Sequence, residues 1–461
     1  MCTSTKSAAA SSIASLCVLM SSAFAAEVTT QMTPDQGYGT SPKLPEPEKS
    51  LIPKVNVAKA NPWKLDEAPT AAQGLAVSRF ACDLDHPRWV YVLPNGDVLV
   101  AETNAPERPD DSKGIKAFFE SKAMKKAGAK TPSANRITLL RDANSDGTPE
   151  LKTKFIEGLY SPFGMALVGN DFYVANADAV VRFNYQQGAT EIKEQGTKLA
   201  DLPGGPINHH WTKNLIASPR GDKLYASVGS NSNVAENGIE AEEKRAAIWE
   251  IDRASGATRV FASGLRNPVG MDWQPQTGVL WTVVNERDEL GNNLVPDYLT
   301  SVKDGGFYGW PYSYFGKNVD DRVETKRPDL VAKAIVPDYG LGSHTASLGL
   351  VFYKGELLPE KYRNGAFIGQ HGSWNRDPRS GYKVIFVSFA NGRPIGLPED
   401  VLTGFLSNQG EARGRPVGVA VSRDGALLVA DDVGNCVWRV TPAGSQASRA
   451  ASASASEATS R

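Results

Sequence analysis

Two of the chain's five histidines, His209 and His210, lie side by side in the stretch "PINHHWTKNLIASPRGDKLYASVGSN". They stand just before two strand-like runs that are joined by a Gly-Asp turn. An imidazole titrates near neutral pH, which suits it to taking and giving protons. Because adjacent strand residues point to opposite faces, at most one histidine of the pair can face a given cavity. The spacing therefore offers one imidazole for acid–base chemistry at the start of this hairpin.

Arginines stand at the same place before two other hairpins. Arg266 and Asn267 precede one in "ASGLRNPVGMDWQP", and Arg413 and Arg415 precede the last one in "RGRPVGVAVSRDG". Strand alternation would put Arg413 and Arg415 on one face, where both could bind a single anion such as a carboxylate. A pair of solvated loop residues is the alternative. Recurrence at one point of a repeat favours a shared site.

The elements that must position these side chains are repeated hairpins. A strand-like run, a turn containing Gly and a second strand-like run recur roughly six times, with turn residues such as "PNGD", "GND" and "RDGA" at the tips. One hairpin unit cannot bury both of its faces, but a closed ring of such units can. We therefore predict an all-β fold, a six-bladed β-propeller of antiparallel four-stranded blades. Loops that enter successive innermost strands of such a ring converge on one end of its central channel.

The composition predicts four segments. Residues 1–25 combine a lysine, an apolar run and the small-residue site "AFA", which predicts a cleaved signal peptide and a periplasmic or secreted protein without a transmembrane span. Residues 26–70 are rich in Pro, Lys and Glu and predict an extended leader rather than core. The propeller is expected over residues 71–442, and residues 443–461 predict a disordered tail. The stretch "GIKAFFESKAMKKAGAK" inside the propeller predicts a helix.

Charge and cysteine content limit the function further. Lys and Arg number 50 against 51 Asp and Glu, so no basic field exists to attract nucleic acid, and a small uncharged substrate is favoured. No Gly-rich nucleotide fingerprint follows a strand and opens a helix, which argues against NAD. Cleavage of the signal leaves Cys82 and Cys436 near the two ends of the propeller. In an oxidising compartment they could form a bridge, and two buried free thiols are the other possibility.

Five stretches, taken in order, resemble one family. "NHHWTKNLIASPRGDKLYASVGS", "GLRNPVGM", "GGFYGWPYSYFG", "FIGQHGSWNR" and "GRPVGVAVSRDG" look like the soluble glucose and sorbosone dehydrogenases. The likeness runs from about Ala76 to Pro442 and is closest to the sorbosone branch, through "NERDELGNNLVPDYLTSVKDGGFYGWPYSY". It implies a six-bladed quinoprotein that uses pyrroloquinoline quinone (PQQ) and calcium. Such an enzyme oxidises a sugar or a sugar-derived aldehyde and passes electrons to an external acceptor, a quinone or a cytochrome.

The resemblance also assigns roles to single residues. His210 matches the general base that takes the proton of the sugar hydroxyl, and Arg266 matches the arginine beside the quinone oxygens. Amide contacts to the cofactor are implied for Asn231 and Asn267. The arginines that hold the carboxylates of the cofactor correspond to Arg413 and Arg415.

The metal and some cofactor contacts depart from the family pattern. The resemblance implies that calcium is held largely by backbone carbonyls in the segment "NERDELG", which points to Arg287 and Asp288, although the Gly-Pro of the glucose enzymes is missing there. The family's cofactor-contacting lysine has no clear counterpart, and Arg376 is a possible replacement. His209 stands where the glucose enzymes have an Asp before the base, so another group, such as Asn208, would have to orient His210. For His344 and His371, near the expected channel loops, structural and functional roles are equally open.

Two other functions compete with this interpretation. A propeller lactonase could use a metal held by oxygen ligands that each follow a strand, namely Glu102, Asn176, Asn285 and Asp431. That reading leaves the histidine and the arginines before the hairpins without a role. A non-catalytic binding propeller is the second alternative, because a fold alone does not imply catalysis.

Overall fold

The computed structural model describes Met1 and residues 32–48, 55–107 and 131–445. The predicted signal peptide, the predicted helix of "GIKAFFESKAMKKAGAK" and most of the predicted tail lie outside the described residues. From Met32 onward, the described residues form one compact unit. It is nearly all β-structure, and its described part contains one short α-helix, α2 (Pro328–Val331).

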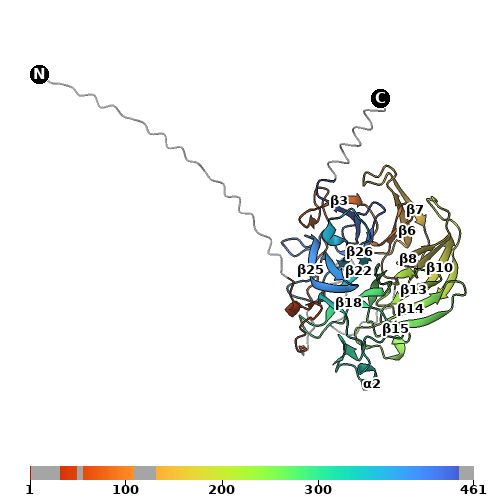
Figure 1. Ribbon diagram of the computed structural model, residues 1–461, viewed down its shortest axis with the longest axis vertical. Helices are drawn as coiled ribbons and strands as arrows, with labels where there is room; N and C mark the ends of the chain where they lie inside the picture. Colours follow the sequence, from red (N-terminus) through yellow and green to blue (C-terminus); the bar gives the residue numbers. More distant parts are fainter. Residues whose placement is uncertain (2–31, 49–54, 108–130, 446–461) are drawn as a thin grey trace. The chain divides into compact units, whose positions relative to one another are not determined.

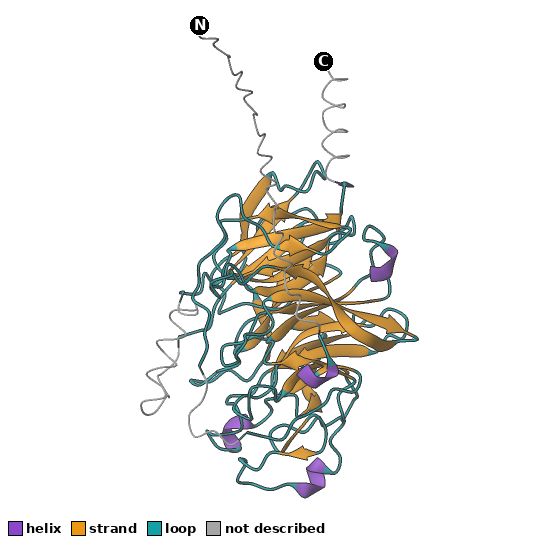
Figure 2. Ribbon diagram, turned by 90° about the vertical axis from the view of Figure 1, so that its left-hand side faces the viewer, coloured by secondary structure: helices purple, strands orange, loops and turns teal. Residues whose placement is uncertain are grey.

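Six antiparallel sheets, each with four main strands, confirm the predicted six-bladed propeller (Figures 1 and 2). The innermost strand of each blade comes first in the chain, except that the last blade takes its outer strand from the N-terminal side. In blade order the strands are β4 (Pro87–Val92), β5 (Val98–Glu102), β6 (Arg136–Arg141) and β7 (Leu151–Ile156); β8 (Met165–Val168), β9 (Asp171–Ala175), β10 (Ala179–Asn184) and β11 (Thr197–Asp201); β12 (Leu215–Ala217), β13 (Lys223–Val228), β14 (Ala247–Asp252) and β15 (Thr258–Ser263); β16 (Pro268–Trp273), β17 (Leu280–Val284), β18 (Pro296–Ser301) and β21 (Tyr339–Ser343); β22 (Ser347–Phe352), β23 (Gly365–Gln370), β24 (Lys383–Ala390) and β25 (Arg393–Thr403); and β26 (Pro416–Val421), β27 (Leu427–Asp431), β28 (Cys436–Pro442) and β3 (Leu75–Ala81).

The hairpins form where the turn residues of the sequence predict them. In the first blade, "PNGD" connects β4 to β5, and Gly96 takes a φ of 98°, which a residue with a Cβ rarely adopts. Its N–H donates to the Leu93 carbonyl at 2.8 Å, which closes the turn. Asn95 donates to the Asp97 carboxylate at 2.7 Å and stabilises the same turn.

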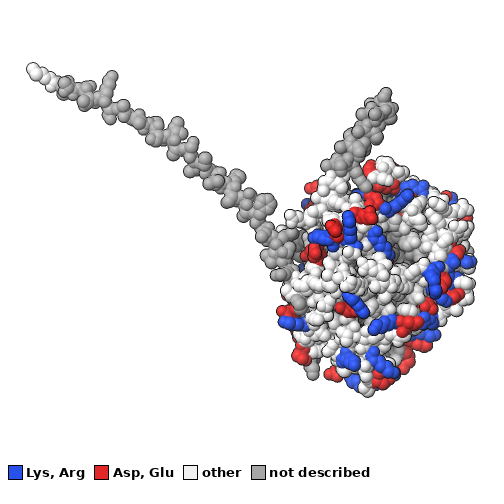
Figure 3. Space-filling view, in the orientation of Figure 1, with Lys and Arg blue, Asp and Glu red and all other residues white. Residues whose placement is uncertain are grey.

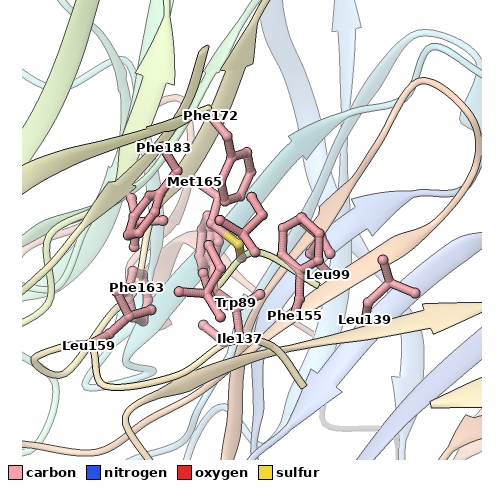
Figure 4. Packing of buried hydrophobic residues seen from close by; sticks show 14 of the residues in the cluster. Trp89, Leu99, Ile137, Leu139, Phe155, Leu159, Phe163, Met165, Phe172 and Phe183 are labelled. Carbon is pink, nitrogen blue, oxygen red and sulfur yellow. The ribbon is translucent and has the colours of Figure 1, made fainter. Parts of the chain in front are cut away.

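Apolar side chains between neighbouring blades form the core. The first two blades share a cluster in which Trp89 on β4 packs against Phe163, with ring centroids 4.8 Å apart (Figure 4). Phe155 on β7 and Phe172 on β9 extend the cluster outward. Each blade thus buries its face against the next one, as a closed ring of hairpins requires.

The ring closes where the N-terminal strand β3 joins the last blade. β3 pairs antiparallel with β28, with Thr441 opposite Ala76. Next to this pairing, Cys82 and Cys436 form a disulfide whose Cα atoms are 4.1 Å apart. Of the two states left open by the sequence, the structure therefore has the bridge, and it ties residues 354 positions apart.

Removal of this bridge should destabilise the ring. A Cys82→Ala, Cys436→Ala double variant should lose about 2–5 kcal/mol of unfolding free energy, because the unfolded chain regains the freedom of a very long loop. Denaturant unfolding of oxidised wild type, reduced wild type and the variant measures the loss. Reduced wild type should match the variant; equal stability of all three would contradict the prediction.

Described parts of the predicted leader pack against the blades, whereas the composition predicted a segment outside the core. Strand β1 (Tyr38–Gly39) adds to the fourth blade beside β21, and β2 (Thr70–Ala71) adds to the fifth beside β25. Tyr38 is buried in a cluster with Trp281, and Ala58 is completely buried against the fifth and sixth blades. The composition is polar on average, yet some of its apolar residues pack against the blades, whereas Leu65 stays exposed.

The surface matches the balanced charge of the sequence. Figure 3 shows lysine and arginine interspersed with aspartate and glutamate on the face in view, with no large patch of one sign. Among the described residues, no helix has the length and apolar character needed to cross a bilayer.

Candidate active site

The predicted functional residues gather at one end of the central channel. In each blade, the start of the innermost strand pairs with the end of the second strand, for example Pro268 with Val284 and Pro416 with Asp431. Loops that enter innermost strands and loops that leave second strands therefore share that end. A cavity of about 850 Å³ lies toward the other end of the inner strands, and none of the predicted site residues line it.

The His210 imidazole is held by Ser230. Its Nδ1 lies 2.9 Å from the Ser230 carbonyl oxygen and 3.0 Å from Ser230 Oγ. A carbonyl only accepts, so Nδ1 carries the proton and Nε2 keeps its lone pair. Burial, followed by the nearby charge of Arg266, lowers the pKa of His210 well below its ordinary value. His210 is thus a neutral base at neutral pH.

Asn208, expected from the sequence as a possible orienting group, has a different role. Its Oδ1 accepts from Arg245 at 3.1 Å and from Lys213 at 3.4 Å, and its Nδ2 donates to the Ala177 carbonyl. These bonds fix the loop below His210. Ser230 is the residue that orients the imidazole.

Arg266 and Asp288 belong to one buried charge network. Arg266 donates to Asn233 Oδ1 at 2.9 Å, and its Nη2 lies 3.6 Å from Asp288 Oδ2. Asp288 Oδ1 accepts from Asn375 at 2.8 Å and lies 3.1 Å from His344 Nδ1. Burial raises the pKa of Asp288, but the hydrogen bond from His344 and the charge of Arg266 lower it by more. The net result is a pKa of about 2. The carboxylate is therefore ionised and its charge is shared among these partners.

His344 acts as the cationic partner of Asp288. Its second ring nitrogen, Nε2, lies 2.9 Å from the Gly291 carbonyl. Both nitrogens face acceptors, which requires both N–H groups and so the charged imidazolium. Burial lowers the pKa of His344, but the bond with Asp288 raises it more, so that the net shift is upward.

Asn267 lies beside His210 because residue 229 is glycine. A Cβ at Gly229 would collide with the Asn267 amide and with the His210 Cβ. The Oδ1 atoms of Asn267 and Asn231 are buried and have no hydrogen-bond partner. An unpaired buried polar atom costs about 1–3 kcal/mol. These two oxygens are therefore suited to a ligand that brings its own donors.

A second polar cluster joins the last blade to the first. The Asp432 carboxylate lies 2.9 Å from His371 Nε2 and 2.8 Å from Arg88 Nη1, and His86 Nε2 is 3.6 Å away. Arg415, 5% exposed, donates to the Tyr382 hydroxyl at 3.0 Å and packs over that ring. Neither Arg88 nor Asp432 was predicted from the sequence. Arg88 is the second residue of β4 and Asp432 directly follows β27, so neither shares a repeat position with the arginines that precede the hairpins.

Three buried atoms of this second cluster have no partner: Arg415 Nε, Arg88 Nε and Asp432 Oδ1. Arg88 also lies over the ring of Trp211, the residue after His210. The cluster therefore borders the His210 site. Its unpaired guanidinium nitrogens are suited to an anionic ligand such as a polycarboxylate.

The burial of His371 predicts that the stability of the fold decreases at acidic pH. Burial lowers its pKa to about 4, although Asp432 opposes the shift, and Arg415 and Arg88 add to it. An unfolded imidazole has a pKa near 6.5, so between pH 4 and 6.5 the unfolded state binds more protons than the folded state. The free energy of unfolding should therefore fall by about 3 kcal/mol as the pH drops from 6.5 to about 4. Urea unfolding across this range should give a flatter profile for His371→Gln. An equally steep profile would mean that His371 is protonated in the folded state.

Two predicted cofactor-binding arginines, Arg413 and Arg376, make other contacts in the structure. Arg413 pairs with Glu67 of the leader at 3.2 Å and shares no partner with Arg415. Alternation does not apply to these two arginines, because β26 begins only at Pro416. The Arg376 guanidinium donates to the carbonyls of Asn292 and Pro378, so it stabilises a loop.

The Arg287 side chain has a structural role, and the metal contact predicted at this segment concerns backbone carbonyls instead. The side chain is completely buried and pairs with Glu286 at 3.0 Å and with Asp320 at 3.1 Å. Of the predicted metal segment, Asp288 therefore supplies the one carboxylate near the His210 site, and its carbonyl already accepts from Arg322 at 2.8 Å. A calcium ion would have to share these oxygens with the nitrogen donors around them.

The structure does not support the metal cage of a lactonase. Glu102 is completely buried and binds Arg136, and Asp431 accepts from two tryptophans. Within the described part of the chain, one group of three His, Cys, Asp or Glu could share a cation, namely Asp142, Asp146 and Glu150. These residues lie in the connection from β6 to β7, away from the residues discussed above.

Comparison with known proteins identifies the family. The model of the TrAA12-like family matches residues 134–302 and 320–443, more than half of the chain. The chain belongs to the TrAA12-like family. An uncharacterised protein of Borreliella burgdorferi is 30% identical over 292 residues, which is 61% of this chain and 76% of that protein.

Two other relatives carry functional names. An aldose sugar dehydrogenase of Escherichia coli is 29% identical over 193 residues, 39% of this chain and 50% of that protein. A pyrroloquinoline quinone-dependent pyranose dehydrogenase of Coprinopsis cinerea is 26% identical over 291 residues, 50% of this chain and 39% of that protein. This chain thus spans half or less of the length of these two relatives.

Solved structures share the fold. The calcium structure of the Trichoderma reesei family AA12 enzyme has a TM-score of 0.66 at 18% identity, covering 85% of this chain and 99% of that one. The holo PQQ domain of the Coprinopsis cinerea pyranose dehydrogenase has a TM-score of 0.65 at 21% identity, covering 84% and 100%. At these identities the likeness concerns the propeller fold.

Proposed function

We propose that this TrAA12-like protein is a PQQ-dependent sugar dehydrogenase that oxidises a CH–OH or aldehyde group. The observation that carries the proposal is the neutral His210, fixed by Ser230 with Nε2 free, beside Arg266 and two unpaired buried amide oxygens. The names of two relatives, an aldose and a pyranose dehydrogenase, support the same reaction class.

The buried atoms without partners suit PQQ, which is a planar polycarboxylate with ring N–H and carbonyl groups. Arg415 would hold a carboxylate, with His371 and Arg88 close by, and Asn231 and Asn267 would accept from donors of the cofactor. Bound there, the quinone would supply the hydride acceptor. Arg266 would add positive charge near its oxygens.

His210 performs the proton transfer in this proposal. Its Nε2 removes the proton of the substrate hydroxyl, and the resulting imidazolium keeps its Nδ1–H bond to the Ser230 carbonyl. Within the described residues, this imidazole is hydrogen-bonded to Ser230 and to no carboxylate, so the cation is stabilised by the Ser230 carbonyl and, at longer range, by Asp288. Such a base holds its proton weakly and can pass it on.

Calcium, sorbosone and export are finer parts of the same proposal. Calcium would bind near Asp288, and the calcium structure of the Trichoderma reesei relative supports this expectation. Sorbosone is proposed as a substrate from the sequence resemblance. The signal-like N-terminus supports a periplasmic or secreted enzyme that reduces an external acceptor.

Reconstitution tests the function directly. Purified protein is titrated with PQQ, with and without calcium, while cofactor absorbance and protein fluorescence are followed. Addition of aldoses or sorbosone should then change the cofactor spectrum and reduce an artificial dye. A folded protein that fails to bind PQQ under either condition would refute the proposal, and binding without oxidation of any sugar in the panel would refute the reaction.

A further inference from the structure

One segment outside the blades contacts each loop that carries a predicted cofactor arginine. We call residues 55–67 the strap. Asn56 donates from Nδ2 to the Arg376 carbonyl at 2.8 Å, and Arg379 donates back to the Asn56 carbonyl at 2.9 Å. The strap therefore fixes the loop between β23 and β24.

The strap also holds the loop before β26. Asn61 N–H donates to the Ala412 carbonyl at 2.8 Å, and Ala412 N–H donates to the Lys59 carbonyl at 2.8 Å, a pattern like that of a strand pair. Further along the strap, Glu67 pairs with Arg413. Arg415 follows two residues later, so its loop is bound to the strap along most of its course.

Trp63 connects the strap to Arg415 through one buried carboxylate. Trp63 Nε1 donates to Asp431 Oδ2 at 2.8 Å, and Trp438 Nε1 donates to the same oxygen at 3.0 Å. Asp431 Oδ1 accepts from the Arg415 N–H at 2.7 Å and from the Gly434 N–H at 2.8 Å. The backbone of Arg415 is thus fixed by a carboxylate whose other oxygen is bonded to the strap.

The environment of Asp431 makes each donor important. The residue is completely buried, and Arg415 contributes only its backbone N–H to the carboxylate. Burial raises the pKa of Asp431 to about 6, while the bonds from Trp438, Gly434, Arg415 and Trp63 oppose that shift. Loss of one donor leaves a buried oxygen short of a partner and favours protonation of the group that orients Arg415.

We propose that Trp63 is a positioning residue for the cofactor site: through Asp431 it fixes Arg415, so that the strap is part of the cofactor-binding structure. This inference rests on the proposed function, in which Arg415 binds a carboxylate of PQQ. It assigns a function to the leader, which the sequence indicated only as an extended segment.

The test separates the N–H of Trp63 from its ring. Trp63→Phe keeps an aromatic ring against Phe405 and Trp438, with which the indole makes edge contacts, and removes only the donor. We expect the dissociation constant for PQQ to rise about tenfold, which is the loss of one hydrogen bond to a charged group. Turnover at saturating PQQ should stay within about twofold of wild type, since His210 is untouched.

Tyr38→Ala is the matched control. It removes a buried anchor of the leader on the fourth blade and has no bond to Asp431. It should lower the melting temperature more than Trp63→Phe does and leave the PQQ affinity unchanged. A purely structural leader predicts the reverse relation, with affinity following stability in both variants, and that result would overturn the inference.

A second readout is the pH profile of PQQ affinity around pH 6, where Asp431 titrates. In Trp63→Phe the midpoint should move to higher pH, because the carboxylate has lost a donor that stabilises its charge. Affinity and midpoint both equal to wild type would refute the positioning role. Wild type that binds no PQQ would instead refute the proposed function, so the two failures are distinguishable.

Discussion

Replacement of His210 by Ala should reduce turnover by about 10²–10⁴-fold and leave PQQ binding nearly unchanged. General base catalysis by a positioned side chain contributes about that factor. The imidazole is the group with a free, unprotonated nitrogen next to Arg266, and alanine leaves the proton of the substrate without an acceptor. Stopped-flow reduction of the bound cofactor measures the loss, and a PQQ titration by fluorescence checks the binding.

The pH dependence gives an independent check on His210. Because burial and Arg266 hold its pKa well below the ordinary value, the acidic limb of kcat/KM should lie below pH 6.5. His209→Asn is the control, since it changes the neighbouring imidazole and should cost at most a few-fold in turnover. Wild-type turnover in His210→Ala would exclude His210 as the base, and an acidic limb above pH 6.5 would contradict the low pKa.

The two arginines before β26 should differ sharply. Arg415→Ala should raise the dissociation constant for PQQ by about 100-fold, because it removes a buried guanidinium that could bind a carboxylate through charge-assisted bonds. Arg413→Ala should change it less than about threefold, because its guanidinium pairs with Glu67 at a partly exposed position, where an ion pair contributes little.

Direct titration of both variants with PQQ decides between the two expectations. Thermal unfolding without cofactor is the control, and it shows whether either loss reflects a damaged fold. If both variants lose affinity equally, both arginines bind the cofactor, as the sequence predicted, and the ion pair with Glu67 does not keep Arg413 from the cofactor. If neither does, the anion site lies elsewhere.

The hairpin repeat was the strongest signal in the sequence, and it predicted the architecture correctly. Turn residues such as Asn95 and Gly96 act locally, and apolar runs on both sides define strands that need neighbours. The same repeat placed His210 and Arg266 before innermost strands, which was enough to predict that they share one end of the channel.

The positions of other residues could not be predicted, because they depend on where a strand begins or on which segment packs against the blades. Arg413 and Arg415 looked equivalent because the sequence did not indicate that regular alternation starts only at Pro416. The leader was read as outside the core because its composition is polar. Its buried residues, such as Tyr38 and Ala58, became visible only with the blades in place.

The sequence by itself determined the repeating hairpin of the fold, the two possible states of Cys82 and Cys436, and the chemistry of the residues before each hairpin. Only the tertiary structure decided which of them meet. Ring closure brings Arg88 to Asp432 across 344 positions and Trp63 to Asp431 across 368. Local patterns constrain neighbours along the chain, whereas contacts between distant loops depend on how the blades pack, and the site is made of such contacts.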